Sequence, residues 1–163
     1  MSVLLGGAEV EQTMEYRQQL IQEYKQAAMP LLHYLPWMEQ HAGKAASSSY
    51  ESSQLTEHSM GFPVYDGTLM NFVKEATKST LMDKNYRYVY SRNHIRNHKD
   101  ERMLIEKAGI NEWNILRGIL SNYVLGGRTK GILWSEAVRE EIFYLILKQM
   151  KSIIEYWDRP FEV

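Results

Sequence analysis

The sequence predicts an all-α protein, a single compact domain over residues 1–163 with about six or seven helices. Three observations support this fold class. Apolar residues recur every three to four positions through most of the chain, as they do on one face of a helix. Only one short stretch, residues 85–91, alternates with the period of a strand. A length of 163 residues, 44% of them hydrophobic, suffices for one packed core.

Two helical segments are expected near the N-terminus. Apolar side chains fall loosely on one face of residues 9–29, and residues 1–8 before them are expected to be disordered. Pro30 ends this helix or opens the next segment, because proline is tolerated in a first turn. Pro36 is expected to kink or divide the apolar stretch that follows, and Gly43 to end it.

Residues 44–60 are expected to form a mobile loop. They hold seven Ser or Thr residues and few side chains to bury. The chain before this loop is too short to fold alone, so the loop is expected to lie within one domain.

The rest of the chain predicts a run of helices. Asp66 is a candidate N-cap for a helix carrying apolar residues from Leu69 to Ala76. The alternating stretch 85–91 has no obvious partner, and a lone strand leaves its backbone groups unsatisfied, so we expect a helix opened by Asp83 instead. Further helices are expected over residues 100–108, 111–126, 129–138 and 141–157.

The sequence contains no cysteine, which excludes disulfide scaffolds, thiolate metal sites and cysteine nucleophiles. The N-terminus lacks the pattern of a signal peptide, and no window approaches the ~18 apolar residues of a membrane span. We therefore expect a cytoplasmic protein without a membrane partner. No cofactor is expected either.

Positive charge is concentrated in one segment. Residues 84–102 carry 6 basic and 2 acidic side chains, whereas residues 1–83 carry 5 basic and 10 acidic ones, and residues 103–163 carry 8 of each. The net charge of −1 argues against a protein that coats nucleic acid non-specifically. Any anion contact is therefore expected to be local.

Two interpretations of the basic, aromatic segment stay open. Its candidate residues are Arg87, Arg92, Arg96, Lys99, Tyr86, Tyr88 and Tyr90. In the favoured, structural interpretation, the cations pair with the acidic N-terminal half while Tyr86 and Tyr90 pack into the core. In the alternative, the cations contact phosphates and the tyrosines stack on bases, as in a nucleic-acid interface.

The same segment contains Arg-Asn-His twice, at 92–94 and 96–98. On a helix, His94 and His98 would share one face and could bind a metal ion with a third ligand. The surrounding cations oppose a metal ion, and Asn93 and Asn97 weaken the helix that the spacing requires. These histidines are weak metal candidates, and a solvated face is favoured.

Two other patterns match known motifs in part. Residues 103–120 have the outline of a helix-turn-helix, although the second helix is as apolar as a central core helix. Residues 126–131, GGRTKG, lack the Gly-Lys-Ser/Thr of a phosphate loop. Arg128 and Lys130 are expected to be exposed cations at a bend, with an anion contact as the alternative. No nucleophile elbow, dinucleotide fingerprint or zinc-protease motif is present.

Three stretches resemble an uncharacterised bacterial family of small helical proteins of unknown function. They are FPVYDGTLMNFV, NYRYVYSRNHIRNH and ILSNYVLGGRTKGILWSEAVREEIFYLILKQM, and the resemblance covers about residues 30–157. It implies a small helical cytoplasmic protein of bacterial origin. It implies no activity, cofactor or catalytic residue.

Three functions stay open at this point. The leading hypothesis is a non-catalytic helical interaction or regulatory domain that binds a protein partner or itself. The alternative is a nucleic-acid-associated domain using residues 84–102 or the corner at 103–120. The third is a metal-dependent enzyme using His94 and His98.

Overall fold

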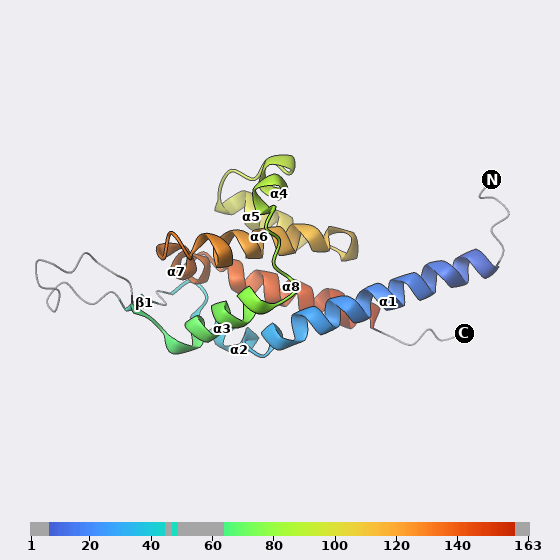
Figure 1. The fold of residues 1–163 in the computed structure, drawn as a ribbon, viewed down its shortest axis with the longest axis horizontal. Helices are drawn as coiled ribbons and strands as arrows, with labels where there is room; N and C mark the ends of the chain where they lie inside the picture. Colours follow the sequence, from blue (N-terminus) through green and yellow to red (C-terminus); the bar gives the residue numbers. More distant parts are fainter. Residues whose placement is uncertain (1–6, 45–46, 49–63, 159–163) are drawn as a thin grey trace, which may run out of the picture.

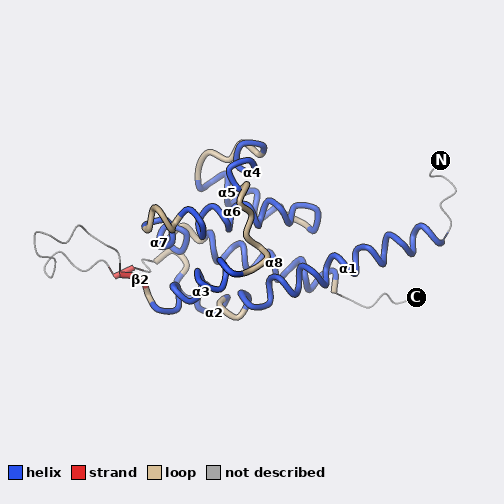
Figure 2. Tube along the Cα trace, in the orientation of Figure 1, coloured by secondary structure: helices blue, strands red, loops and turns tan. Residues whose placement is uncertain are grey.

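The computed structural model describes residues 7–44, 47–48 and 64–158. Within them lie eight α-helices, slightly more than the six or seven expected, and the shortest are α2 and α4, of seven residues each. The sole strand pairing described is the antiparallel contact of β1 (Ser47–Ser48) with β2 (Val64–Tyr65), and helix dominates the rest (Figure 2). The all-α fold class is confirmed.

The first two helices are α1 (Gly7–Leu32) and α2 (Leu35–His41). α1 begins inside the stretch expected to be disordered and continues two residues past Pro30, which lies in its last turn. Pro36 occupies the start of α2, where a missing N–H needs no helical partner, so this proline divides the segment as predicted. Apart from Lys44 and β1, the predicted mobile loop at 44–60 lies outside the described residues.

The next helices are α3 (Gly67–Lys78) and α4 (Tyr86–Arg92). Asp66 caps α3 as predicted, since its Oδ1 accepts a hydrogen bond of 2.7 Å from the Thr68 N–H. The helical interpretation of the Tyr-rich stretch is confirmed, but Asp83 does not cap α4. The Asp83 carboxylate instead accepts from the Asn85 N–H, 2.8 Å away, in the turn that precedes the helix.

The C-terminal half contains α5 (His98–Lys107), a 3₁₀ turn (Ile110–Glu112), α6 (Trp113–Gly126), α7 (Ile132–Arg139) and α8 (Ile142–Trp157). α6 is the central helix, because it packs against α3, α4, α5, α7 and α8. Its buried side chains include Trp113, Leu116, Ile119, Leu120 and Val124. α8 buries an equally continuous face, against α1, α2 and α5 among others.

The helices form layers on two sides of α6 (Figure 1). α4 and α5 lie together on one side, whereas α1, α2 and α3 lie on the other. The N-terminal half of α1 extends beyond the rest of the molecule. In the part of the chain that the structure describes, no helix combines the length and apolar character needed to cross a membrane.

Candidate functional site

The cations of the basic segment are exposed. Arg87, Arg92, Arg96 and Lys99, which we call the cationic face, form no ion pair with any described residue. Arg102 does pair, with Glu140 at 3.1 Å. The predicted pairing with the acidic N-terminal half is therefore wrong for the described residues, because α4 and α5 lie across α6 from α1 and α3 (Figure 1).

The three tyrosines of this segment have different environments. Tyr86 is half-buried, with the Arg87 guanidinium 6.0 Å from its ring centroid. Tyr90 packs against the core, as predicted. Tyr88 is 64% exposed and its ring contacts no other described ring, so one face is free to stack.

Tyr88 and Arg92 also line a cleft of about 510 Å³ between α4 and the start of α6, which we call the α4–α6 cleft. They are one helical turn apart and so lie on the same side of α4. The complete lining is Asp83, Tyr88, Val89, Arg92, Asn93, Asn111, Asn114, Ile115 and Arg117. The cleft thus joins the basic segment to the corner at 103–120, two regions that the sequence suggested separately.

Arg117 is a cleft residue that the sequence did not single out. Its guanidinium donates to the backbone oxygens of Thr80, Leu81 and Met82 at 3.1–3.3 Å, and to Asn114 Oδ1 at 3.2 Å. These bonds hold the group in place, and no described carboxylate pairs with its charge. No local pattern could reveal this role, because the carbonyls lie 35–37 residues away in the chain.

A buried carboxylate connects α4, α5 and α6. The Glu101 side chain is only 5% exposed and accepts from Tyr90 Oη at 2.5 Å and from Tyr123 Oη at 2.7 Å. The Glu101 Oε1 also lies 2.8 Å from His98 Nδ1, while His98 Nε2 lies 2.7 Å from Glu136 on α7. Since both ring nitrogens face carboxylate oxygens, the imidazolium form satisfies this arrangement best.

This network shifts three pKa values. Burial, and then the Glu101 carboxylate, raise the pKa of Tyr90 and of Tyr123, so both hydroxyls remain donors. Burial alone would lower the pKa of His98, but the hydrogen bonds and charges of Glu101 and Glu136 together raise it. His98 lines neither the α4–α6 cleft nor the second cavity described below. We therefore regard the network as structural.

His94 and His98 do not share a helix face. α4 ends at Arg92 and α5 begins at His98, so the two Arg-Asn-His triplets do not stack. His94 is exposed in a left-handed conformation (φ 55°) between the helices. Among the described residues, no three His, Asp or Glu side chains are grouped to hold a metal ion.

The two motif-like stretches have structural roles. α6 is buried by helices on several sides, which favours the core-helix interpretation over a helix that enters a DNA groove. Gly127 lies where any Cβ would come within 2.1 Å of Trp134 Nε1, so the glycine allows this indole to pack and to donate to the Val124 carbonyl. Arg128 and Lys130 are exposed at the bend, as predicted.

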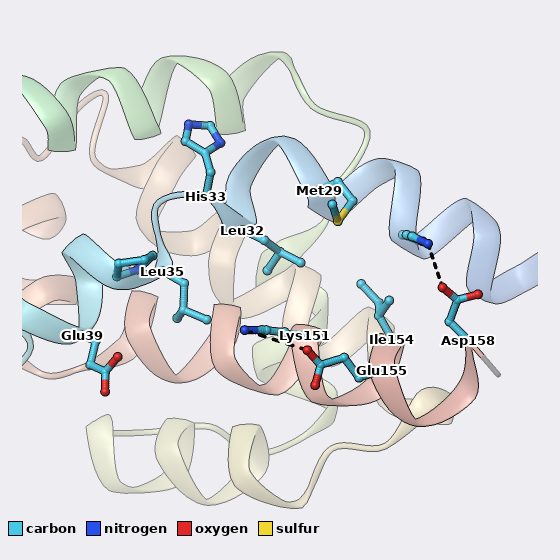
Figure 3. A pocket seen from close by; sticks show the side chains of 11 residues that line it. Met29, Leu32, His33, Leu35, Glu39, Lys151, Ile154, Glu155 and Asp158 are labelled. Atoms are coloured by element: carbon cyan, nitrogen blue, oxygen red, sulfur yellow. Dashed lines mark hydrogen bonds and ion pairs between the residues drawn. The ribbon is translucent and has the colours of Figure 1, made fainter.

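A second cavity, the α1–α8 groove, lies between α1, α2 and α8 and measures about 830 Å³ (Figure 3). Met29, Leu32, Leu35 and Ile154 supply its apolar lining. Most of its charged residues are paired with each other, with Lys25 2.7 Å from Asp158 and Lys151 3.8 Å from Glu155, whereas Glu39 forms no ion pair with a described residue. This groove therefore offers apolar surface, whereas the cationic face offers charge without a described counterion.

Comparison of the chain with protein-family models, with curated proteins and with solved structures finds no match. The resemblance to a bacterial family thus stays an expectation. The candidate function rests on the geometry described above.

Proposed function

We propose that this chain is a non-catalytic binding domain that recognises a negatively charged partner through the cationic face. The observation that supports this proposal is the exposure of Arg87, Arg92, Arg96 and Lys99 without an ion pair to any described carboxylate. Even a surface ion pair contributes only about 0–1 kcal/mol to stability, and these cations form no such pair with a described residue. Several unpaired cations within one short segment raise the local positive potential and attract anions at short range.

The charge of the rest of the chain restricts this attraction to the cationic face. The net charge is −1, so surfaces away from residues 84–102 do not attract a polyanion overall. The Asp100 carboxylate, which lies within the segment, accepts from the backbone N–H of Arg96 at 3.0 Å and pairs with no cation. Binding is therefore expected to depend on position and on salt.

The test measures the affinity of the full chain for three polyanions: a heparin fragment, polyglutamate and a short single-stranded oligonucleotide. The variant Arg87→Ala/Arg96→Ala/Lys99→Ala removes three cations and leaves Arg92 in the cleft. We expect weaker binding and a salt dependence that is less steep by about 2 in the slope of log K against log salt, because three fewer contacts form and fewer counterions are released on binding.

The matched control is Lys44→Ala/Lys74→Ala/Lys78→Ala, which makes the same change in net charge at exposed positions away from α4 and α5. This control should retain the wild-type affinity and salt slope for whichever polyanion binds. Equal losses in the two triple variants would mean that only net charge matters. That result, or no binding of any of the three polyanions at low salt, would refute the proposal.

A further inference from the structure

The α4–α6 cleft presents groups that the binding of a bare polyanion does not require. Its volume of about 510 Å³ falls within the ~300–1,000 Å³ range of small-molecule sites. An aromatic ring, two guanidinium groups, three side-chain amides and one carboxylate line it. The inference below rests on the proposed function, in which the partner is negatively charged. We ask which charged ligand would contact the ring, the guanidinium groups, the amides and the carboxylate together.

The ring and the free cation lie on one side of the cleft. Tyr88 is 64% exposed with an unstacked ring, and the Arg92 side chain, one turn later on α4, is exposed with no ion pair to a described residue. A flat ring beside a guanidinium suits a base beside its phosphate, because every base has a face that stacks on tyrosine. Sulfated sugars and acidic side chains contain no aromatic ring.

The amides supply donors and acceptors for the edge of a base. Asn93 Nδ2 donates to the Val89 carbonyl at 2.8 Å, which leaves its Oδ1 as an acceptor. Asn114 Oδ1 accepts from Arg117, which leaves its Nδ2 as a donor. The Asn111 side chain is exposed. Side-chain amides of this kind read the hydrogen-bonding edges of bases.

Two charges further restrict the ligand. The Arg117 guanidinium is held in place and adds positive potential, whereas Asp83 places a carboxylate in the same lining. A carboxylate accepts from the amino group of a base and repels additional phosphates. The balance therefore suits one base with one phosphate better than a polyphosphate.

We infer that the α4–α6 cleft binds one nucleotide unit, with its base on Tyr88 and its phosphate at Arg92. The unit comes either from a single strand, whose bases are free to leave the stack, or from a free nucleoside monophosphate. A duplex keeps its bases paired and cannot fill the cleft in this way.

The test measures binding of the full chain to a mixed-sequence single strand, to the same sequence as a duplex, and to the four nucleoside monophosphates. Tyr88→Ala should weaken binding of the single strand by about tenfold or more, because stacking on one base is lost. Tyr88→Phe keeps the ring and should bind like wild type. Tyr16→Ala, which removes a 63% exposed tyrosine from α1, is the matched control and should change nothing.

A second pair of variants tests the phosphate contact. Arg92→Ala should weaken binding more than Arg87→Ala, since both arginines are exposed on α4 but only Arg92 lines the cleft. Loss of monophosphate binding in Tyr88→Ala and Arg92→Ala would assign the site to free nucleotides as well as strands. Loss confined to the oligonucleotide would assign it to strands.

The inference is overturned if Tyr88→Ala and Tyr16→Ala bind the single strand equally, and no monophosphate binds. In that case, a loss of polyanion binding in the triple variant of the cationic face would still support the proposed function. Absence of binding to every polyanion would refute both.

Discussion

Asn93 and Asn97 hold the same place in the two Arg-Asn-His triplets, yet they act at the ends of different helices. Asn93 is the C-cap of α4, and Asn97 is the N-cap of α5, where its Oδ1 accepts from the Asp100 N–H at 2.8 Å. The sequence indicated that asparagine weakens a helix here, which is the physical reason for the break. It did not indicate that each asparagine ends or begins a separate helix.

The partners of His98 and Glu101 could not be predicted from local pattern. Glu101 was one of two acids among six bases in residues 84–102, but its hydrogen-bond partners Tyr90 and Tyr123 are 11 and 22 residues away. Glu136, the second partner of His98, is 38 residues away. Only the packing of α4, α5, α6 and α7 brings these groups together, and this packing raises the pKa of His98.

The raised pKa of His98 predicts a stability that depends on pH. A group whose pKa is higher in the folded state binds its proton more tightly there. Protonated His98 therefore adds fully to the free energy of unfolding at pH values below the ordinary pKa near 6.5. This stabilisation is lost as the pH rises through the higher pKa of the folded state. We expect the free energy of unfolding in urea to fall over this window in wild type, and to fall less in His98→Gln.

His94→Asn is the control for this measurement. His94 is exposed and contacts neither carboxylate of the network, and asparagine tolerates its left-handed backbone. This variant should keep the wild-type pH dependence. An unchanged dependence in His98→Gln would mean that the imidazolium is not what joins α5 to α7.

At the scale of helices, long periodic segments were predicted best. The helices expected at 111–126 and 141–157 appear as α6 and α8 with small shifts at their starts, because each buries a wide continuous face. Short helices were predicted less well. The start of α5 came two residues earlier than expected, because the cap at Asn97 determines it.

The position of α4 depends on one close contact that periodicity cannot show. A Cβ on Gly118 of α6 would lie 2.6–2.8 Å from three side-chain carbons of Val89 on α4. Glycine at this position lets the two helices approach closely beside the α4–α6 cleft, which Val89 lines. In the sequence, Gly118 appears only as a weak point in a helix.

We expect Gly118→Ala to destabilise the protein by about 1–3 kcal/mol, because an overpacked contact forces the helices apart. Adding Val89→Ala should restore part of this loss, so the two changes should be non-additive in urea denaturation. Gly67→Ala is the control, since a Cβ there meets no atom within 4 Å. Additive effects of Gly118→Ala and Val89→Ala would contradict a direct contact.

At the scale of the whole molecule, the fold class was predictable but the layering was not. Periodicity predicts how many faces must be buried, whereas the choice of neighbours depends on contacts far apart in sequence. This layering affects the proposed function directly. Placing α4 and α5 across α6 from the acidic N-terminal helices leaves the cationic face without the internal partners that charge counting suggested (Figure 1).

The layers nevertheless share contacts that should make unfolding a single event. Tyr24 of α1 stacks on Trp113 of α6 with ring centroids 4.2 Å apart and planes 3° from parallel. Lys25 of α1 pairs with Asp158, just after α8. α1 is thus attached to the central helix and to the end of the last one, which favours one cooperative unit.

We therefore expect one urea transition, with coincident curves from far-ultraviolet circular dichroism and tryptophan fluorescence. Tyr24→Leu should move both curves together to lower urea, since an aromatic pair contributes about 0.5–1.5 kcal/mol beyond its buried area. Tyr16→Leu, at an exposed position of the same helix, should move neither. If helical signal were instead lost before the fluorescence changed, α1 would unfold separately and the single-domain interpretation would be wrong.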